Sequence, residues 1–162
     1  MQKGRSIGYC NISTDSSDIS IETEINSGAY YGNFKVFKNN DLNIRGNLKN
    51  RYCNGYCELY EGVNIKKKGF YENGSLVLGK TYENGRIIYD GQLVCEKHYI
   101  SSYILNTFYV KSSDYDGKGK LYEYSGDKYY IYDGNFKNGK IKNGKKYDDK
   151  GNILFEGVFL NK

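Results

Sequence analysis

The strongest constraint on the fold of this chain is a repeat of glycines. When Gly134 is aligned with Gly69, the segments GNFKNGKIKNGKKYDDKGNILFEG and GFYENGSLVLGKTYENGRIIYDG place five glycines in register with one single-residue gap. The matched pairs are Gly69 and Gly134, Gly74 and Gly139, Gly79 and Gly144, Gly85 and Gly151, and Gly91 and Gly157. Such internal similarity is typical of repeat architectures, in which each unit packs on its neighbours.

The repeat extends over most of the 162 residues. The central glycines of the repeated strand element fall at Gly46, Gly69, Gly91, Gly134 and Gly157, with steps of 23, 22, 43 and 23 residues. Because 43 is close to two steps, we expect a degenerate copy between residues 92 and 125. With a shortened copy at YYGNF (30–34), about six units fill residues 29–162. Residues 1–28 are expected to form a non-repeat cap with one strand, at ISIETEI (19–25).

Each unit reads as two strands and two turns. Large side chains alternate with glycine at a period of two, as in Tyr132, Gly134 and Phe136, which places them on one face of a strand. Asn-Gly steps, which favour hairpin turns, occur in ENG (72–74 and 83–85) and KNG (137–139 and 142–144). No segment carries a sustained helical stripe. The sequence therefore predicts an all-β fold, an elongated twisted antiparallel sheet of about six tandem β-hairpin repeats.

The segment GKGKLYEYSGDKYYIYDGNFKNG (117–139) resembles the MORN repeat. The matching positions are Gly117, Gly119, Leu121, Gly126, Tyr132, Gly134 and Phe136. The chain departs from the pattern where Lys146, Thr81 and Cys57 replace the second glycine of Gly-x-Gly. It also resembles bacterial MORN-like antitoxin and variant repeat proteins, which share strand ends of the type Tyr-x-x-Gly. The resemblance implies tandem hairpins that serve in protein interaction, scaffolding or dimerisation, and in some members phospholipid binding.

Residues suited to catalysis are sparse, and the chain is predicted not to be an enzyme. The single histidine, His98, has no nucleophile in a recognisable motif nearby. GSLVLGKT (74–81) matches a phosphate-binding loop literally, but the next hairpin follows where that loop requires a helix. The repeat itself generates this spacing. Asp90, Asp133 and Glu156 are expected on the face opposite the rings, as a solvated row of charge beside lysines.

Metal and nucleic-acid binding are the other chemistries considered, and neither is predicted. The one candidate zinc set is Cys53, Cys57, Cys95 and His98, whose two halves lie nearly two units apart and are not expected to be adjacent in a meander. Cys57 at a glycine position is better explained as a small buried residue. Tyr and Lys interleave as in single-strand binders, yet the repeat already requires these rings. No cofactor is expected.

The predicted function is a non-catalytic protein-interaction or scaffolding module that binds a partner protein along a Tyr-rich sheet face. The ring-bearing residues proposed for this face are Tyr30, Phe34, Tyr89, Tyr132, Phe136, Phe155 and Phe159. Whether these rings contact a partner or pack on one another stays open at this stage.

Three alternative functions stay open. In the first, the chain is an inhibitor or antitoxin-like protein that masks an enzyme. In the second, it is an adaptor that binds anionic phospholipid through Lys66–Lys68 and Lys137–Lys146, which the net charge of +5 would favour. Exposed strand edges also allow a homodimer by sheet extension. In the absence of an apolar segment of signal or membrane type, we expect an intracellular, cytoplasmic protein, peripheral at a membrane in the adaptor case.

Overall fold

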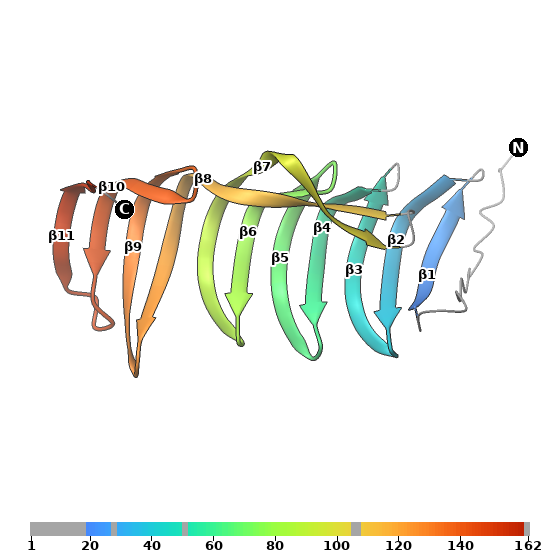
Figure 1. Ribbon diagram of the computed structural model, residues 1–162, viewed down its shortest axis with the longest axis horizontal. Helices are drawn as coiled ribbons and strands as arrows, with labels where there is room; N and C mark the ends of the chain where they lie inside the picture. Colours follow the sequence, from blue (N-terminus) through green and yellow to red (C-terminus); the bar gives the residue numbers. More distant parts are fainter. Residues whose placement is uncertain (1–18, 27–28, 50–51, 105–107, 161–162) are drawn as a thin grey trace, which may run out of the picture.

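The computed structural model describes residues 19–26, 29–49, 52–104 and 108–160, and for residues 19–21, 24–26, 29–31, 95–104 and 108–113 it describes the backbone alone. In this part of the chain eleven strands form one open sheet in the order of the sequence, each antiparallel to the next, and there is no helix (Figure 1). The predicted all-β class and the elongated antiparallel sheet are confirmed.

The strand bounds follow the repeat. They are β1 (Ile19–Asn26), β2 (Ala29–Lys38), β3 (Asp41–Lys49), β4 (Tyr52–Glu61), β5 (Asn64–Glu72), β6 (Ser75–Glu83), β7 (Arg86–Ile104), β8 (Phe108–Ser125), β9 (Lys128–Lys137), β10 (Lys140–Tyr147) and β11 (Ile153–Val158). The strand expected at residues 19–25 is β1, which pairs with β2 and so continues the sheet. Residues 1–18 of the predicted cap lie outside the described residues.

Three of the four Asn-Gly steps form the predicted turns. Asn73, Asn84 and Asn138 have φ of 47°, 50° and 50°, and each is followed by a glycine with positive φ, the combination required by tight hairpins. The fourth step was predicted wrongly. Asn143 and Gly144 lie inside β10, and the chain turns instead at Asp148, whose carboxylate accepts hydrogen bonds from the backbone N–H groups of Lys150 (3.0 Å) and Asn152 (2.8 Å).

A row of glycines crosses the sheet from β3 to β11. Its members stand directly opposite one another in successive strands, and we call them the glycine row: Gly46, Gly69, Gly79, Gly91, Gly119, Gly134, Gly144 and Gly157, with Cys57 in the β4 position. A Cβ on Gly69 would lie 2.3 Å from the carbonyl oxygen of Leu78 and 2.6 Å from the Cα of Gly79. The recurrent glycines therefore permit close approach of neighbouring backbones.

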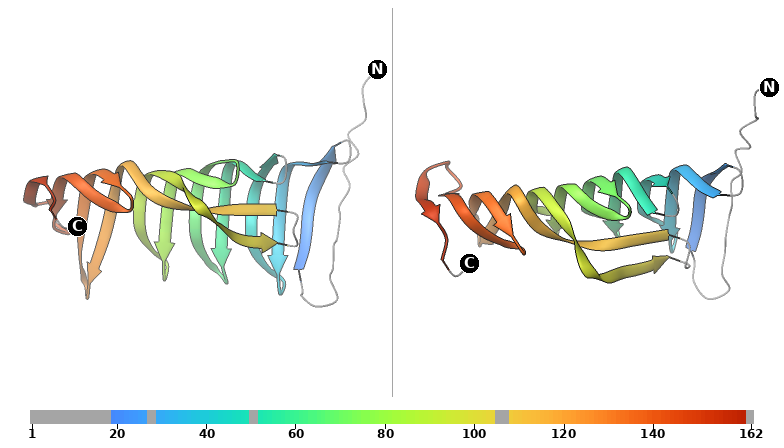
Figure 2. Two further views of the ribbon diagram at one scale, coloured as in Figure 1. Left: turned by 45° about the horizontal axis from the view of Figure 1, so that its top comes forward. Right: turned by 90° about the horizontal axis from the view of Figure 1, so that it is seen from above.

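The same glycines allow the strands to curve. Gly69, Gly144 and Gly157 have φ of 149°, 148° and 144°, values that residues with a Cβ rarely adopt. In the view from above in Figure 2, successive strands are strongly curved in the same direction, so that the sheet encloses one of its own faces. We call the enclosed face, which carries the core, the inner face, and the opposite one the outer face.

The degenerate unit expected between residues 92 and 125 does not exist. Gly91 and Gly119 are direct partners, so β7 and β8 are neighbours in the glycine row and together form one long hairpin. Beyond the row this long hairpin leaves the array and folds back along it towards β3 and β4 (Figures 1 and 2), where Tyr109 pairs in parallel with Tyr52. The 43-residue step arises because both strands are about twice the usual length.

The core is a single cluster that runs along the inner face. Its buried members are Phe34, Val36, Ile44, Leu48, Cys53, Cys57, Tyr71, Leu76, Tyr89, Leu93, Tyr132, Phe136 and Ile141. Turns are tied back to it by the backbone, since Gly74 N–H donates to the carbonyl of Cys53 (2.9 Å) and Gly139 N–H to that of Tyr115 (3.0 Å). Each of these two bonds connects a hairpin to a strand of the preceding hairpin.

Candidate functional site on the outer face

The ring-bearing residues predicted to bind a partner lie mostly in the core. Phe34, Tyr89, Tyr132 and Phe136 are at most 3% exposed. Phe155 in β11 is exposed, the nearby Phe159 is partly buried, and the side chain of Tyr30, in β2, lies outside the described residues. Four of the seven predicted residues thus offer no surface to a partner in this structure.

These rings are buried because the curved sheet brings them onto one another. Tyr89 stacks on Tyr115 with ring centroids 3.9 Å apart and meets the edge of Phe136 at 5.2 Å. The Tyr89 ring also lies over Gly119, where an added Cβ would come within 2.4 Å of its Cζ atom. Burial raises the pKa of Tyr89, whose hydroxyl donates to the Gln92 carbonyl at 2.7 Å. A ring therefore lies over bare glycine at this position, with a packing role.

The outer face carries a row of charges one position away from the glycine row. We call it the charge ladder, and its members are direct cross-strand partners: Glu22, Lys35, Arg45, Glu58, Lys68, Lys80, Asp90, Lys120, Asp133, Lys145 and Glu156. Four of the contacts are ion pairs: Arg45–Glu58 (2.7 Å), Lys80–Asp90 (3.5 Å), Lys120–Asp133 (3.7 Å) and Lys145–Glu156 (3.7 Å). The predicted charged row opposite the rings is confirmed, and exposed pairs of this kind add little stability each.

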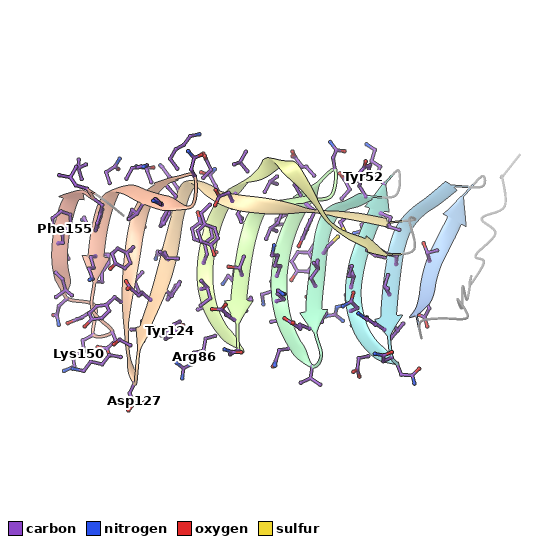
Figure 3. The ribbon with its side chains drawn as sticks, in the orientation of Figure 1. Tyr52, Arg86, Tyr124, Asp127, Lys150 and Phe155 are labelled. Atoms are coloured by element: carbon purple, nitrogen blue, oxygen red, sulfur yellow. The ribbon has the colours of Figure 1, made fainter. Side chains whose placement is uncertain are left out.

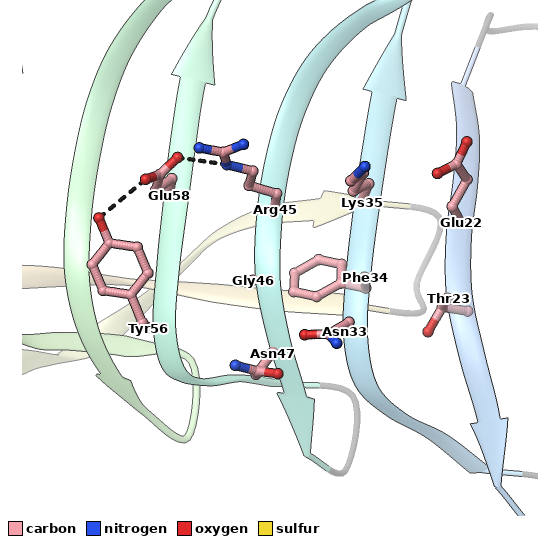
Figure 4. Close-up of a pocket in the computed structure, with 10 residues that line it drawn as sticks. All are labelled: Glu22, Thr23, Asn33, Phe34, Lys35, Arg45, Gly46, Asn47, Tyr56 and Glu58. Atoms are coloured by element: carbon pink, nitrogen blue, oxygen red, sulfur yellow. Dashed lines mark hydrogen bonds and ion pairs between the residues drawn. The ribbon is translucent and has the colours of Figure 1, made fainter.

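Glu58 is the one ladder member that is buried, and its carboxylate holds three donors. Arg45 Nε donates to it at 2.7 Å and the Tyr56 hydroxyl at 3.0 Å (Figure 4). The Tyr60 hydroxyl is the third donor. The hydrogen bond from Arg45 is the largest cause that lowers the pKa of Glu58, and the two tyrosines act in the same direction. A carboxylate so occupied fastens β3 to β4 and does not suit a general base.

An open groove of about 670 Å³ lies beside this cluster on β1 to β4. Glu22, Lys35 and Arg45 line it with Glu58, and the asparagines Asn33 and Asn47 close one side (Figure 4). In the same view the long hairpin passes behind the strands that carry these side chains, on the inner face. The groove is therefore open and carries charges of both signs, without the enclosure typical of small-molecule sites.

Three large apolar side chains lie next to the ladder on the outer face. Tyr56 in β4, Phe70 in β5 and Leu78 in β6 are direct cross-strand partners and are 43%, 56% and 48% exposed. The rings of Tyr56 and Phe70 meet edge to face at 6.0 Å. We call these three residues the apolar strip. A contiguous exposed apolar surface of this kind marks interaction sites more often than single exposed residues do.

The sequence carried a signal for the apolar strip that the prediction missed. Each strip residue adjoins a residue of the glycine row on the side away from the ladder, as in Tyr56-Cys57-Glu58, Lys68-Gly69-Phe70 and Leu78-Gly79-Lys80. At strand period, the two neighbours of a row residue share the face opposite to it. Aligning the units on their glycines and comparing these two flanking positions would have identified the strip.

The proposed zinc ligands are brought together only in part. Cys53 and Cys57 are buried free thiols of β4, and Cys57 Sγ donates to the Asn47 carbonyl at 3.4 Å. The side chains of Cys95 and His98 lie outside the described residues. The long hairpin does bring β8 beside β4, at Tyr109 and Tyr52, whereas Cys95 and His98 belong to β7. In the described residues no three His, Cys, Asp or Glu side chains group as metal ligands.

The segment with the literal phosphate-loop pattern is a turn and a strand. Gly74 ends the β5–β6 turn, Ser75–Glu83 is β6, and Gly79 belongs to the glycine row. No helix follows Thr81, so the backbone N–H groups needed to hold a phosphate are used in the sheet. The interpretation of these glycines as repeat positions is confirmed.

The lysines proposed to hold phospholipid are interspersed with carboxylates. Lys66 pairs with Glu61 (3.1 Å), Lys137 with Asp116 (2.9 Å) and Lys145 with Glu156 (3.7 Å). In the part of the chain that the structure describes, no helix has the length and apolar character to cross a membrane.

Comparisons with protein-family models, with curated proteins and with solved structures gave no match.

Proposed function

We propose that this chain is a non-catalytic protein-interaction module of MORN type, and that it holds a partner protein on its outer face through the apolar strip. One observation carries the proposal. Tyr56, Phe70 and Leu78 lie in register on three adjacent strands and remain about half exposed, although each could have been polar without cost to the core. Tyr and Phe on a rigid sheet provide contact area with little loss of conformational entropy.

The charges beside the strip define the chemistry of the partner. Lys68 and Lys80 are neighbours on the ladder, and Lys80 forms an ion pair with Asp90. The ammonium group of Lys68 lies over the ring of Tyr82 at 5.6 Å, and its cross-strand carboxylate, Glu58, is already occupied by three donors. A partner that suits this surface presents an apolar side chain to Phe70 and a carboxylate to Lys68.

The proposal includes the cytoplasmic location expected from the sequence. Cys53 and Cys57 are both free thiols in the core, which accords with a reducing compartment. A scaffold and an inhibitor of antitoxin type both fit this surface, and the identity of the captured protein distinguishes them. Phospholipid has less support, because ladder cations alternate with carboxylates over β6 to β11.

The test is affinity capture from the native cell with three baits: the parent chain, Phe70→Ser and Val63→Ser. Val63 is an exposed apolar residue of the β4–β5 turn, outside the strip, and serves as the matched control. We expect one protein in stoichiometric amount with the parent and with Val63→Ser, and at least tenfold less with Phe70→Ser, the loss that a central aromatic contact gives. Equal recovery with Phe70→Ser would place the binding surface elsewhere. Loss of an enzyme's activity on binding would identify the inhibitor role.

A further inference from the structure

The last strand of the sheet occupies a repeat position that has a neighbour on one side only. Among the described strands β11 pairs with β10 alone, so one row of its backbone N–H and C=O groups is unpaired (Figure 1). The large residues Ile153, Leu154, Phe155, Val158 and Leu160 are all exposed there. Figure 3 shows Phe155 at this end of the array. The opposite end differs, because Thr23 of β1, level with the glycine row, is buried.

Equivalent residues inside the array show what this position lacks. Tyr132 precedes Gly134 by two residues, as Phe155 precedes Gly157, and Tyr132 is 1% exposed whereas Phe155 is 42% exposed. A Cβ on Gly134 would lie 2.0 Å from a backbone oxygen of the next strand. A Cβ on Gly157 would meet only the Phe155 ring, at 3.5 Å. Gly157 has the backbone conformation for close approach of another strand, and the described strands provide none on that side.

We propose that a second copy of this chain fills the position, so that β11 pairs antiparallel with β11 of the second copy about a twofold axis at Gly157. This register continues the glycine row, since Gly157 lies opposite Gly157. It sets Phe155 opposite Phe159 and Glu156 opposite Val158. A twofold axis keeps each face on its own side, so the outer residues of one copy meet outer residues of the other.

Charge and strand direction favour this arrangement over two alternatives, a twofold axis at another residue and head-to-tail stacking of copies. Moving the axis to Glu156 would set two carboxylates directly opposite each other, which is unfavourable. Stacking β1 of a second copy in the same orientation on β11 would require a parallel pair, because strands alternate in direction and both are odd-numbered. That arrangement would also extend without closing. The twofold pair is antiparallel and closed.

The test is sedimentation equilibrium of the full chain and of two variants at one site. We expect the parent mass to rise towards that of a dimer between about 10 µM and 1 mM, as suits an interface smaller than a standard one. Val158→Glu places a carboxylate opposite Glu156 in both symmetry-related contacts, so the dissociation constant should rise about fivefold. Val158→Lys should lower it by a similar factor.

Matched controls separate this pairing from a general effect of charge. Val63→Glu and Val63→Lys change an exposed residue in the β4–β5 turn and should leave the dissociation constant unchanged. Phe70→Ser should still dimerise, because the apolar strip is on β4 to β6, so failure of one proposal is distinguishable from failure of the other. A parent that stays monomeric throughout overturns the dimer. Equal shifts for Val158→Glu and Val158→Lys overturn the register.

Discussion

At the scale of single residues, the distance between neighbouring backbones is set by the glycine row. Most positions of this row have a partner glycine on each side, and a methyl group at Gly69 would overlap atoms of β6. Backbone atoms cannot rotate away as a side chain does. Substitution in the row is therefore costly for two separate reasons, contact and φ.

Gly69→Ala is expected to lower the free energy of unfolding by about 3 kcal/mol or more, because the clash with Leu78 and the strain at a φ of 149° act together. Gly62→Ala is the control, a turn glycine with a φ of 59° and no atom within 4 Å of an added Cβ, for which about 1 kcal/mol is expected. Urea denaturation followed by circular dichroism measures both. Similar losses at the two sites would contradict the close-approach role.

Glu58 gives the structure a dependence on pH with a definite sign. The pKa of Glu58 lies below its ordinary value of 4.5, mainly through the hydrogen bond from Arg45. A carboxyl group whose pKa is lower in the folded state stabilises that state above its unfolded pKa and loses this contribution as pH falls through the folded pKa.

Glu58→Gln is accordingly expected to cost about 1 kcal/mol at pH 7, a modest value since the Arg45 side chain is half exposed, and the difference from the parent should shrink below about pH 4. Glu61→Gln, which removes the exposed pair with Lys66, should stay within about 0.5 kcal/mol of the parent at every pH. Unfolding free energies measured from pH 3 to 8 give both curves. A pH-independent Glu58→Gln difference would refute the assignment.

At the scale of elements, the long hairpin departs from the simple meander that the other described strands form. Its first part belongs to the array, because Gly91 pairs with Gly119 and Leu93 is in the core. Its second part reaches back to β4, where Tyr109 pairs with Tyr52. The hairpin thus adds a long-range connection to a sheet whose other strand pairs join consecutive strands.

Deletion of residues 95–113 should separate these two parts. Val94 and Asp114 are direct partners, so an Asn-Gly turn inserted between them closes a shorter hairpin without disturbing the glycine row. We expect the sheet to form, with about 1–2 kcal/mol less stability from the lost pairing with β4. Hydrogen exchange should increase at the start of β4 and stay unchanged in β9 and β10. Unaltered exchange at Tyr52 would show that the connection is not formed in solution.

At the scale of the whole molecule, the chain is a linear array with local cooperation. Strands contact their sequence neighbours and the core runs along the inner face. Among the described strands, only the long hairpin pairs with a strand distant in sequence. In such an array stability is close to a sum of unit and neighbour contributions, so damage at one end need not spread to the other.

Ile141→Ala in β10 is expected to cost about 2–5 kcal/mol, because it removes a fully buried side chain. The loss should appear as faster hydrogen exchange in β9 to β11, with β3 to β5 little changed. Ile44→Ala in β3, an equally buried isoleucine, is the mirror control and should show the reverse distribution. Uniformly faster exchange in both variants would indicate a single cooperative unit.

The turns and the sharing of faces were predictable from local chemistry. Asn-Gly specifies a tight turn through positive φ. The period of two places Asp90 and Asp133 on the face of the sheet opposite to that of Tyr89 and Tyr132. Asn143-Gly144 was wrongly predicted to be a turn, because the glycine of this dipeptide belongs to the glycine row inside β10. The apolar strip was missed for a similar reason. Its residues are recognisable only when the units are aligned on their glycines, because the three strip residues are of different types.

The sequence by itself determined an all-β chain of hairpins whose glycines lie at matching places, because turn propensity and alternation act between residues close in the chain. The tertiary structure decided which face is buried, and with it the roles of the tyrosines. Alternation shows which residues share a face, while the direction in which the sheet curves depends on φ at the glycines of many strands together. The path of the long hairpin was also decided there, by contacts between β4 and β8 that no local pattern encodes.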